Sequence, residues 1–172
     1  GYLPISLQAA WLADYEVEVA SRTGGAPTVF DAVGEYNDAN PVARPLPEWK
    51  VNGTLNWGLD QHRAFLLVKY VSGVNHNFTG GSTFFAATAA LAHGQAFADR
   101  FLDSSINSWI TADAQYTYSF GDLKYLSDAS VSVGVLNLTN EEPPFVPVIT
   151  GYDGTLHDPR GRVWTLRLSA SL

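Results

Sequence analysis

The sequence predicts an all-β fold: an antiparallel up-and-down transmembrane β-barrel, to which these 172 residues contribute six strands. Three observations support this prediction: alternation of apolar and polar side chains, a regular order of short and long links, and aromatic residues at segment ends. A period of two is typical of strands, because successive side chains point to opposite faces of a sheet. Six segments show this period: 3–15, 49–58, 63–71, 109–120, 129–138 and 161–172.

The apolar face of each segment is free of charged residues. The opposite face is rich in Ser, Thr, Asn and Gln, with occasional charges such as Lys69 and Asp113. Alternation by itself fits two architectures, because a soluble β-sandwich also buries one face of each strand. A choice between a membrane barrel and a sandwich therefore depends on the links and on the aromatic residues.

The links between consecutive segments alternate in length along the chain. They run long, short, long, short and long, over residues 16–48, 59–62, 72–108, 121–128 and 139–162. Strands that go up and down would place every long link at one end of the sheet and every short link at the other. Outer-membrane barrels are built in this way, with short periplasmic turns and longer extracellular loops.

Aromatic residues mark both ends of the predicted strands. Trp49 and Trp57 bracket one apolar face and lie roughly 26 Å apart at about 3.3 Å per residue. With a strand tilt near 40° this is a height of about 20 Å, close to the ~25 Å apolar band of a membrane barrel. Further aromatics lie at long-link ends (Tyr15, Tyr70, Trp164) and at a short-link end (Tyr116, Tyr118, Phe120). Trp and Tyr are favoured at both membrane interfaces.

Composition excludes several classes of function. The net charge of -7, with 10 Lys and Arg residues and no basic cluster, argues against a nucleic-acid partner, because phosphate binding needs concentrated positive charge. The absence of cysteine excludes a disulfide framework or a thiolate site within this chain. No apolar run approaches 18 residues, so no transmembrane helix is expected.

No catalytic, metal or cofactor site is expected. The histidines fit no ligand spacing, and no nucleophile elbow of the G-x-S-x-G type is present. They are interpreted as loop histidines: His62, His76, His93 and His157.

Six strands are too few to close a membrane barrel, because bacterial barrels begin at eight and open edges are not tolerated facing lipid. The start of the sequence, GYLPISLQAAWL, has neither an initiator Met nor the basic start of a signal peptide. We therefore expect a piece of a longer chain, with the missing strands preceding Gly1.

Two stretches near the end of the sequence form a recognisable pair of motifs. GVLNLTNEEPPFVP (134–147), followed by GYDGTLHDPRGRVWTLRLSASL (151–172), resembles the C-terminal end of TonB-dependent outer-membrane receptors. PLPEWKVNGTLNW (45–57) is similar to a strand of the same family. The residues that match the motifs are Asn137, Leu138, Asn140, Pro143, Pro144, Asp158, Pro159, Arg160 and Gly161. The family usually ends in Phe, whereas this chain ends in Leu172.

The resemblance implies an outer-membrane transporter of a Gram-negative bacterium, not an enzyme. It implies a 22-strand barrel around an N-terminal plug, with uptake of a scarce nutrient driven by contact with TonB through the absent N-terminal part. Outer-membrane lipid, the assembly machinery and a small nutrient ligand would be the other partners. The assembly signal would be the apolar face of the last strand: Trp164, Leu166, Leu168, Ala170 and Leu172. The nutrient cannot be read from these residues.

The motif residues also have a local physical meaning. Asp158 can accept a hydrogen bond from backbone two residues on, Pro159 fixes φ near -65°, and Gly161 tolerates a positive φ. This predicts a tight turn into the last strand. Pro143, Pro144 and Pro147 cannot donate to a sheet, so the chain should leave the sheet there.

Two groups of loop residues are candidates for binding. Phe78, Phe84 and Phe85 could form a ligand-contact patch; the bland interpretation is a turn at Gly80-Gly81 and a short Ala-rich helix. The acidic residues of the last long link could hold a cation, although a solvated charged loop is the more common outcome. They are Glu141, Glu142, Asp153 and Asp158.

Two other functions fit the same alternation. One is a soluble β-sandwich that binds carbohydrate and buries the apolar faces in a dry core. The other is a small closed barrel with a structural or adhesive role. Fractionation distinguishes the sandwich, because a membrane barrel stays with detergent and a soluble module does not.

Overall fold

A computed structural model describes residues 1–21, 24–36, 45–76, 81–100, 102, 105–123, 125–146 and 151–171; at 81–86, 122–123 and 126 it describes the backbone alone. The fold is mostly β, with two helices. Its main element is a six-stranded antiparallel sheet. The strands are β1 (Ile5–Trp11), β5 (Trp49–Leu59), β6 (His62–Val71), β9 (Trp109–Leu123), β10 (Leu126–Leu136) and β11 (Val163–Ser171).

Each predicted segment forms one strand of this sheet, and the strands lie side by side in chain order. The prediction of six up-and-down antiparallel strands is therefore confirmed. β1 and β11 form the two edges, and the sheet does not close into a barrel.

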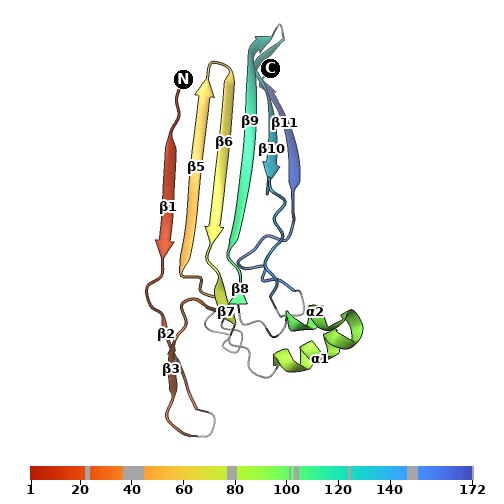
Figure 1. Cartoon of the computed structure of the whole chain (residues 1–172). Helices are drawn as coiled ribbons and strands as arrows, with labels where there is room; N and C mark the ends of the chain where they lie inside the picture. Colours follow the sequence, from red (N-terminus) through yellow and green to blue (C-terminus); the bar gives the residue numbers. More distant parts are fainter. Residues whose placement is uncertain are drawn as a thin grey trace.

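The order of short and long links sorts the connections onto two ends of the sheet. The β5–β6 and β9–β10 turns lie at one end, here called the turn end, and the chain ends lie beside them (Figure 1). The three long connections gather at the other, the long-loop end (Figure 1). The predicted sorting of the links is confirmed.

Three strand limits differ from the prediction by more than two residues. β1 ends at Trp11 instead of residue 15, because its partner β5 begins opposite it at Trp49 and the last pairing bond joins Leu12 N to Glu48 O at 3.0 Å. The predicted 121–128 link is shorter, because β9 and β10 continue into it as far as Leu123 and Leu126. The pairing of β9 with β10 shifts register near this turn. Such an irregularity cannot be seen in the alternation of side chains.

The register brings the six apolar faces onto one side of the sheet, called the apolar face below. One row crosses all six strands: Ile5, Leu55, Leu66, Ala114, Val135 and Trp164. Among the described elements, each strand of the sheet contacts only its neighbours within the sheet. Large apolar side chains on this face are consequently exposed, with Leu7 at 73% and Leu168 at 75%.

The opposite side, called the polar face, carries cross-strand hydrogen bonds. Ser6 Oγ lies 2.5 Å from Thr54 Oγ1, and Thr117 Oγ1 lies 2.8 Å from Ser132 Oγ. Such pairs link neighbouring strands side by side.

The long-loop end contains smaller elements that the alternation did not predict. They are the β2–β3 hairpin (Glu16–Val19 and Thr28–Asp31), and a three-stranded sheet of β4 (Glu35–Tyr36), β7 (Val74–His76) and β8 (Ser105–Ile106). These strands have only two to four residues each, too few for a detectable period.

A buried apolar cluster ties the three long connections together. Tyr36, Val74 and Ile106 come from the small sheet, and Val146 comes from the connection before β11. Val146 is fully buried. The long-loop end therefore has a core of its own, separate from the six-stranded sheet.

The predicted Ala-rich helix is present as two pieces. α1 (Gly81–His93) and α2 (Gln95–Asp99) pack against each other through Ala89 and Ala98. Gly94 separates them with a φ of 87°, a conformation that only glycine adopts without strain. Both helices lie at the long-loop end (Figure 1).

Candidate functional site

The first half of the motif closes a tight loop directly after β10. Asn137 has a φ of 50°, and its side chain hydrogen-bonds the backbone of Glu141 twice. Asn137 Nδ2 donates to Glu141 O, and Glu141 N donates to Asn137 Oδ1, both at 2.8 Å. The side-chain amide thus takes the place of a backbone partner, and the chain leaves the sheet here. Pro143 and Pro144 follow outside any strand, as predicted, and Pro147 lies outside the described residues.

The second half of the motif forms the predicted turn into β11. Arg160 N donates to Asp158 Oδ1 at 3.1 Å, and Gly161 has a φ of 54°. The Arg160 guanidinium also binds the same carboxylate, with Nη2 2.6 Å from Oδ2. Hydrogen bonds from the Arg160 side chain and backbone lower the pKa of Asp158 to about 2.

The two halves of the motif meet across the connection between β10 and β11. Asn140 Oδ1 accepts a hydrogen bond from Arg162 N at 2.9 Å. A Cβ atom on Gly161 would lie 3.3 Å from that same oxygen, a tighter approach than side chains normally make. Asn140 therefore fixes the start of β11, and Gly161 leaves room for it to do so.

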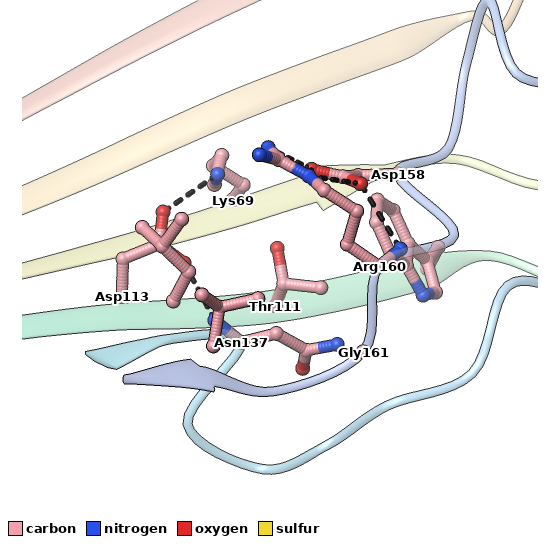
Figure 2. A pocket seen from close by; sticks show the side chains of 10 residues that line it. Lys69, Thr111, Asp113, Asn137, Asp158, Arg160 and Gly161 are labelled. Atoms are coloured by element: carbon pink, nitrogen blue, oxygen red, sulfur yellow. Dashed lines mark hydrogen bonds and ion pairs between the residues drawn. The ribbon is translucent and has the colours of Figure 1, made fainter. Parts of the chain in front are cut away.

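A small polar cavity of about 90 Å³ lies where this connection meets the polar face of the sheet (Figure 2). β9 contributes Thr111 and Asp113, β6 contributes Lys69, and the motif contributes Asp158 and Arg160. Lys69 Nζ lies 2.7 Å from Asp113 Oδ2, and Asn137 N donates to Asp113 Oδ1 at 2.9 Å. Two ion pairs therefore border one cavity.

The floor of the cavity holds polar groups without partners. Thr111 and Trp109 alternate with apolar residues on β9 and are 3% and 8% exposed. Thr111 Oγ1 and Trp109 Nε1 have no hydrogen-bond partner among the described residues. Because an unpaired buried polar group is costly, a ligand or water that bonded these groups would be favoured here.

His157 covers Trp109 and anchors the connection to the sheet. Its ring packs edge-on against the indole, with centroids 5.2 Å apart, and its backbone N–H donates to Asp153 O at 3.0 Å. Burial lowers the pKa of His157, so the imidazole is neutral at pH 7.

The other three histidines have separate aromatic neighbours. His62 Nδ1 lies 2.5 Å from Tyr116 Oη at the turn end, His76 stacks on Tyr36, and His93 meets Phe97 edge-on. Across the part of the chain that the structure describes, no group of His, Asp or Glu residues could hold a metal ion.

The acidic residues of the last long link do not assemble into one site. Asp158 binds Arg160, whereas Asp153 Oδ1 accepts hydrogen bonds from the backbone and side chain of Thr155. Although burial raises the pKa of Asp153, the bonds from Thr155 lower it below its usual range. Asp153 and Asp158 are therefore each held by hydrogen bonds of their own, which for Asp153 include one from the side chain of Tyr36.

The proposed aromatic ligand patch is only partly visible. Phe78 lies outside the described residues, and Phe84 and Phe85 lie on α1, where the structure describes the backbone alone. The patch therefore stays a prediction. A wider hollow of about 490 Å³ is bordered by Arg100, Glu142 and Phe145. The Arg100 guanidinium lies 4.2 Å from the centre of the Phe145 ring, a contact that no sequence pattern indicated.

The predicted assembly residues lie on the apolar face of the edge strand β11. Trp164, Leu166 and Leu168 are all exposed, and so is Ala170. Leu172 lies outside the described residues. Their role in assembly stays a prediction.

Comparisons with known proteins give no further identification. No protein-family model matches the chain, and no curated protein or solved structure matches it. The helices of the described residues include none that is long and apolar enough to cross a membrane. The resemblance to TonB-dependent receptors therefore rests on the motif residues themselves.

The role of Asn137 can be separated into its hydrogen bonds and its backbone conformation. Asn137→Ala should destabilise the protein by about 2–4 kcal/mol, since it loses two hydrogen bonds and replaces Asn, which tolerates a positive φ, by Ala, which does not. Asn137→Gly should cost about 1–2 kcal/mol, because only the bonds are lost. Unfolding of the full-length protein by denaturant measures both, and equal costs would contradict the conformational part.

The ion pair at the turn predicts an unusual titration. The carboxyl of Asp158 should titrate near pH 2, so its stabilising effect is complete above about pH 4 and is lost as the pH falls toward 2. Arg160→Gln should raise this midpoint toward the ordinary 3.8. Carboxyl-carbon NMR, assigned with Asp158→Asn, measures the midpoint; a value of 3.8 in the unchanged protein would exclude the pairing.

Proposed function

We propose that this chain is the C-terminal part of the barrel of a TonB-dependent outer-membrane receptor, which takes up a scarce nutrient. The observation that carries the proposal is the continuous apolar face of the sheet, which no described element covers. In water, each exposed Leu on this face forgoes the roughly 1.5–3 kcal/mol that burial would supply. A surface of this kind on six adjacent strands suits a lipid environment.

The aromatic residues support the same environment. Trp11 stacks on Trp49 at the long-loop end of the apolar face, with ring centroids 5.9 Å apart. At the turn end, His62 lies against Trp57, Tyr116 and Tyr118. Rings with a polar atom are favoured where the apolar layer meets water, so two such groups at opposite ends fit the two interfaces of a membrane.

The edges of the sheet support membership of a larger barrel. β1 and β11 each pair on one side only. At an edge that faced lipid, each unpaired backbone N–H or C=O group would cost several kcal/mol. Further strands of the full-length protein would pair with these edges. The polar face, with its ion pairs and hydroxyl groups, would then line the interior.

In this arrangement the long-loop end is extracellular and the turn end periplasmic. The nutrient would meet the long loops, where Phe78, Phe84 and Phe85 are candidates for contact. TonB would act through the part of the receptor that precedes this chain. The apolar residues of β11 would be read by the assembly machinery. The nutrient would be a metal chelate, a cobalamin or an oligosaccharide.

The soluble sandwich is the second candidate, and the contacts of the sheet count against it. A sandwich made by this chain would place a second layer over the apolar face, and the described elements supply none. A sandwich could still form if two copies of the chain stacked on each other through their apolar faces. Purification without detergent as a soluble dimer would favour this alternative.

Neighbouring positions on β9 test which face meets lipid. Ala114→Arg places a charge on the apolar face and should destabilise by about 2–4 kcal/mol near the membrane midplane. Gln115→Arg is the matched control on the polar face of the same strand and should cost less than about 1 kcal/mol. Unfolding of the full-length protein in bilayers gives both values, and equal costs would rule out the assigned faces.

The orientation can be tested with single cysteines at exposed positions, because the chain has none of its own. Leu91→Cys on α1 should react with a membrane-impermeant maleimide on intact cells, whereas Tyr125→Cys at the β9–β10 turn should react only after lysis. Both side chains are highly exposed, at 91% and 77%. Labelling of the turn but not of the helix would reverse the orientation.

A further inference from the structure

The polar cavity between β9 and the Asp158–Arg160 turn has a buried floor and an open mouth. Thr111 and Trp109 form the floor, with 3% and 8% exposure. Lys69 and Arg160 stand at the mouth, where their side chains are 43% and 66% exposed. Figure 2 shows the Thr111 hydroxyl directed toward the space that these two cations border. A small molecule can therefore reach the floor from solvent.

Hydrogen-bond donors outnumber free acceptors around this space. Each oxygen of Asp158 accepts two bonds from Arg160, whereas each oxygen of Asp113 accepts one bond and keeps one acceptor position open. The Thr111 hydroxyl and the Trp109 N–H have no partner among the described residues. Lys69 and Arg160 each keep N–H groups beyond those that bind their aspartates. The complementary occupant is consequently an acceptor with several lone pairs.

We propose that this cavity binds a carboxylate group. A carboxylate offers two oxygens and about four acceptor positions, which suit the Thr111 hydroxyl at the floor and the two cationic donors at the mouth. Asp113 and Asp158 oppose a third negative charge, but each already faces its own cation, so the four charges sum to zero. The cavity of about 90 Å³ admits a group of this size and excludes a large ligand from the floor.

The proposal does not depend on the membrane assignment, because the cavity lies on the polar face of the sheet. Its failure would leave the proposed transport function unchanged. The carboxylate can belong to a free small molecule or to an acidic side chain that reaches in through the mouth. The ligands in the experiment separate these two sources.

Acetate is the probe, and the indole N–H of Trp109 is the reporter. The full-length protein, labelled with ¹⁵N at tryptophan and assigned with Trp109→Phe, is titrated with sodium acetate at constant ionic strength. We expect a saturable shift of the Trp109 signal. Methyl acetate, which lacks the charge, and sodium chloride should not reproduce it. A capped glutamate then tests whether a side-chain carboxylate also enters.

Thr111→Val is the decisive variant, because it removes the hydroxyl and keeps the shape of the side chain. It should weaken acetate about tenfold, equivalent to about 1.4 kcal/mol. Thr117→Val is the matched control on the same strand and face; Thr117 bonds Ser132 and does not border the cavity, so affinity should be unchanged. Lys69→Gln gives an independent check, with a similar expected loss.

Binding of acetate alone assigns the site to free small carboxylates, and binding of the capped glutamate as well extends it to acidic side chains. Either result, with the Thr111→Val loss, supports the proposal. No saturable shift, an equal shift with chloride, or unchanged affinity in both Thr111→Val and Lys69→Gln would overturn it and leave a cavity that holds water only.

Discussion

The pairing register of the six-stranded sheet is the constraint on which the other features depend. Because side chains alternate with a period of two, a slip of one residue between neighbouring strands would move a whole apolar set to the other face. The Lys69–Asp113 ion pair and the hydroxyl pairs hold the polar face together across strands. A slipped strand would carry such groups to the apolar face, where they would have no hydrogen-bond partner. One register therefore gives both a continuous apolar face and a polar face.

The motif residues have a structural role in the connection between β10 and β11. Asn137 closes the loop after β10, and Asn140 holds the start of β11 through Arg162 N. With both ends fixed, the connection is drawn over the polar face, where His157 packs on Trp109. The cavity is a result of this arrangement, because the turn at Asp158 spans the sheet without filling the space above Thr111. The motif residues thus shape both the connection and the proposed binding site.

The sequence predicted what depends on local repetition. Strand order, the two faces, the Ala-rich helix and the turn at Asp158 and Gly161 all follow from periods or from residues within one turn. The short strands β4, β7 and β8 were not predictable, because contacts distant in sequence decide them. The cavity was missed for the same reason. Lys69 and Asp113 carry a polar-face signal in the sequence, but nothing there brings the Asp158–Arg160 turn toward them.

The three long connections share one buried cluster, made of Tyr36, Val74, Ile106 and Val146. Residues inside this cluster tolerate substitution less well than residues outside it. A substitution within the cluster disturbs three connections at once, so these positions must change together. The β2–β3 hairpin and the α1–α2 pair have small apolar clusters of their own, built around Val17 and Ala89. Exchange of the α1–α2 pair would also remove the contacts of Phe97 and Arg100 with Phe145, whereas the hairpin can change in length with less effect on its surroundings.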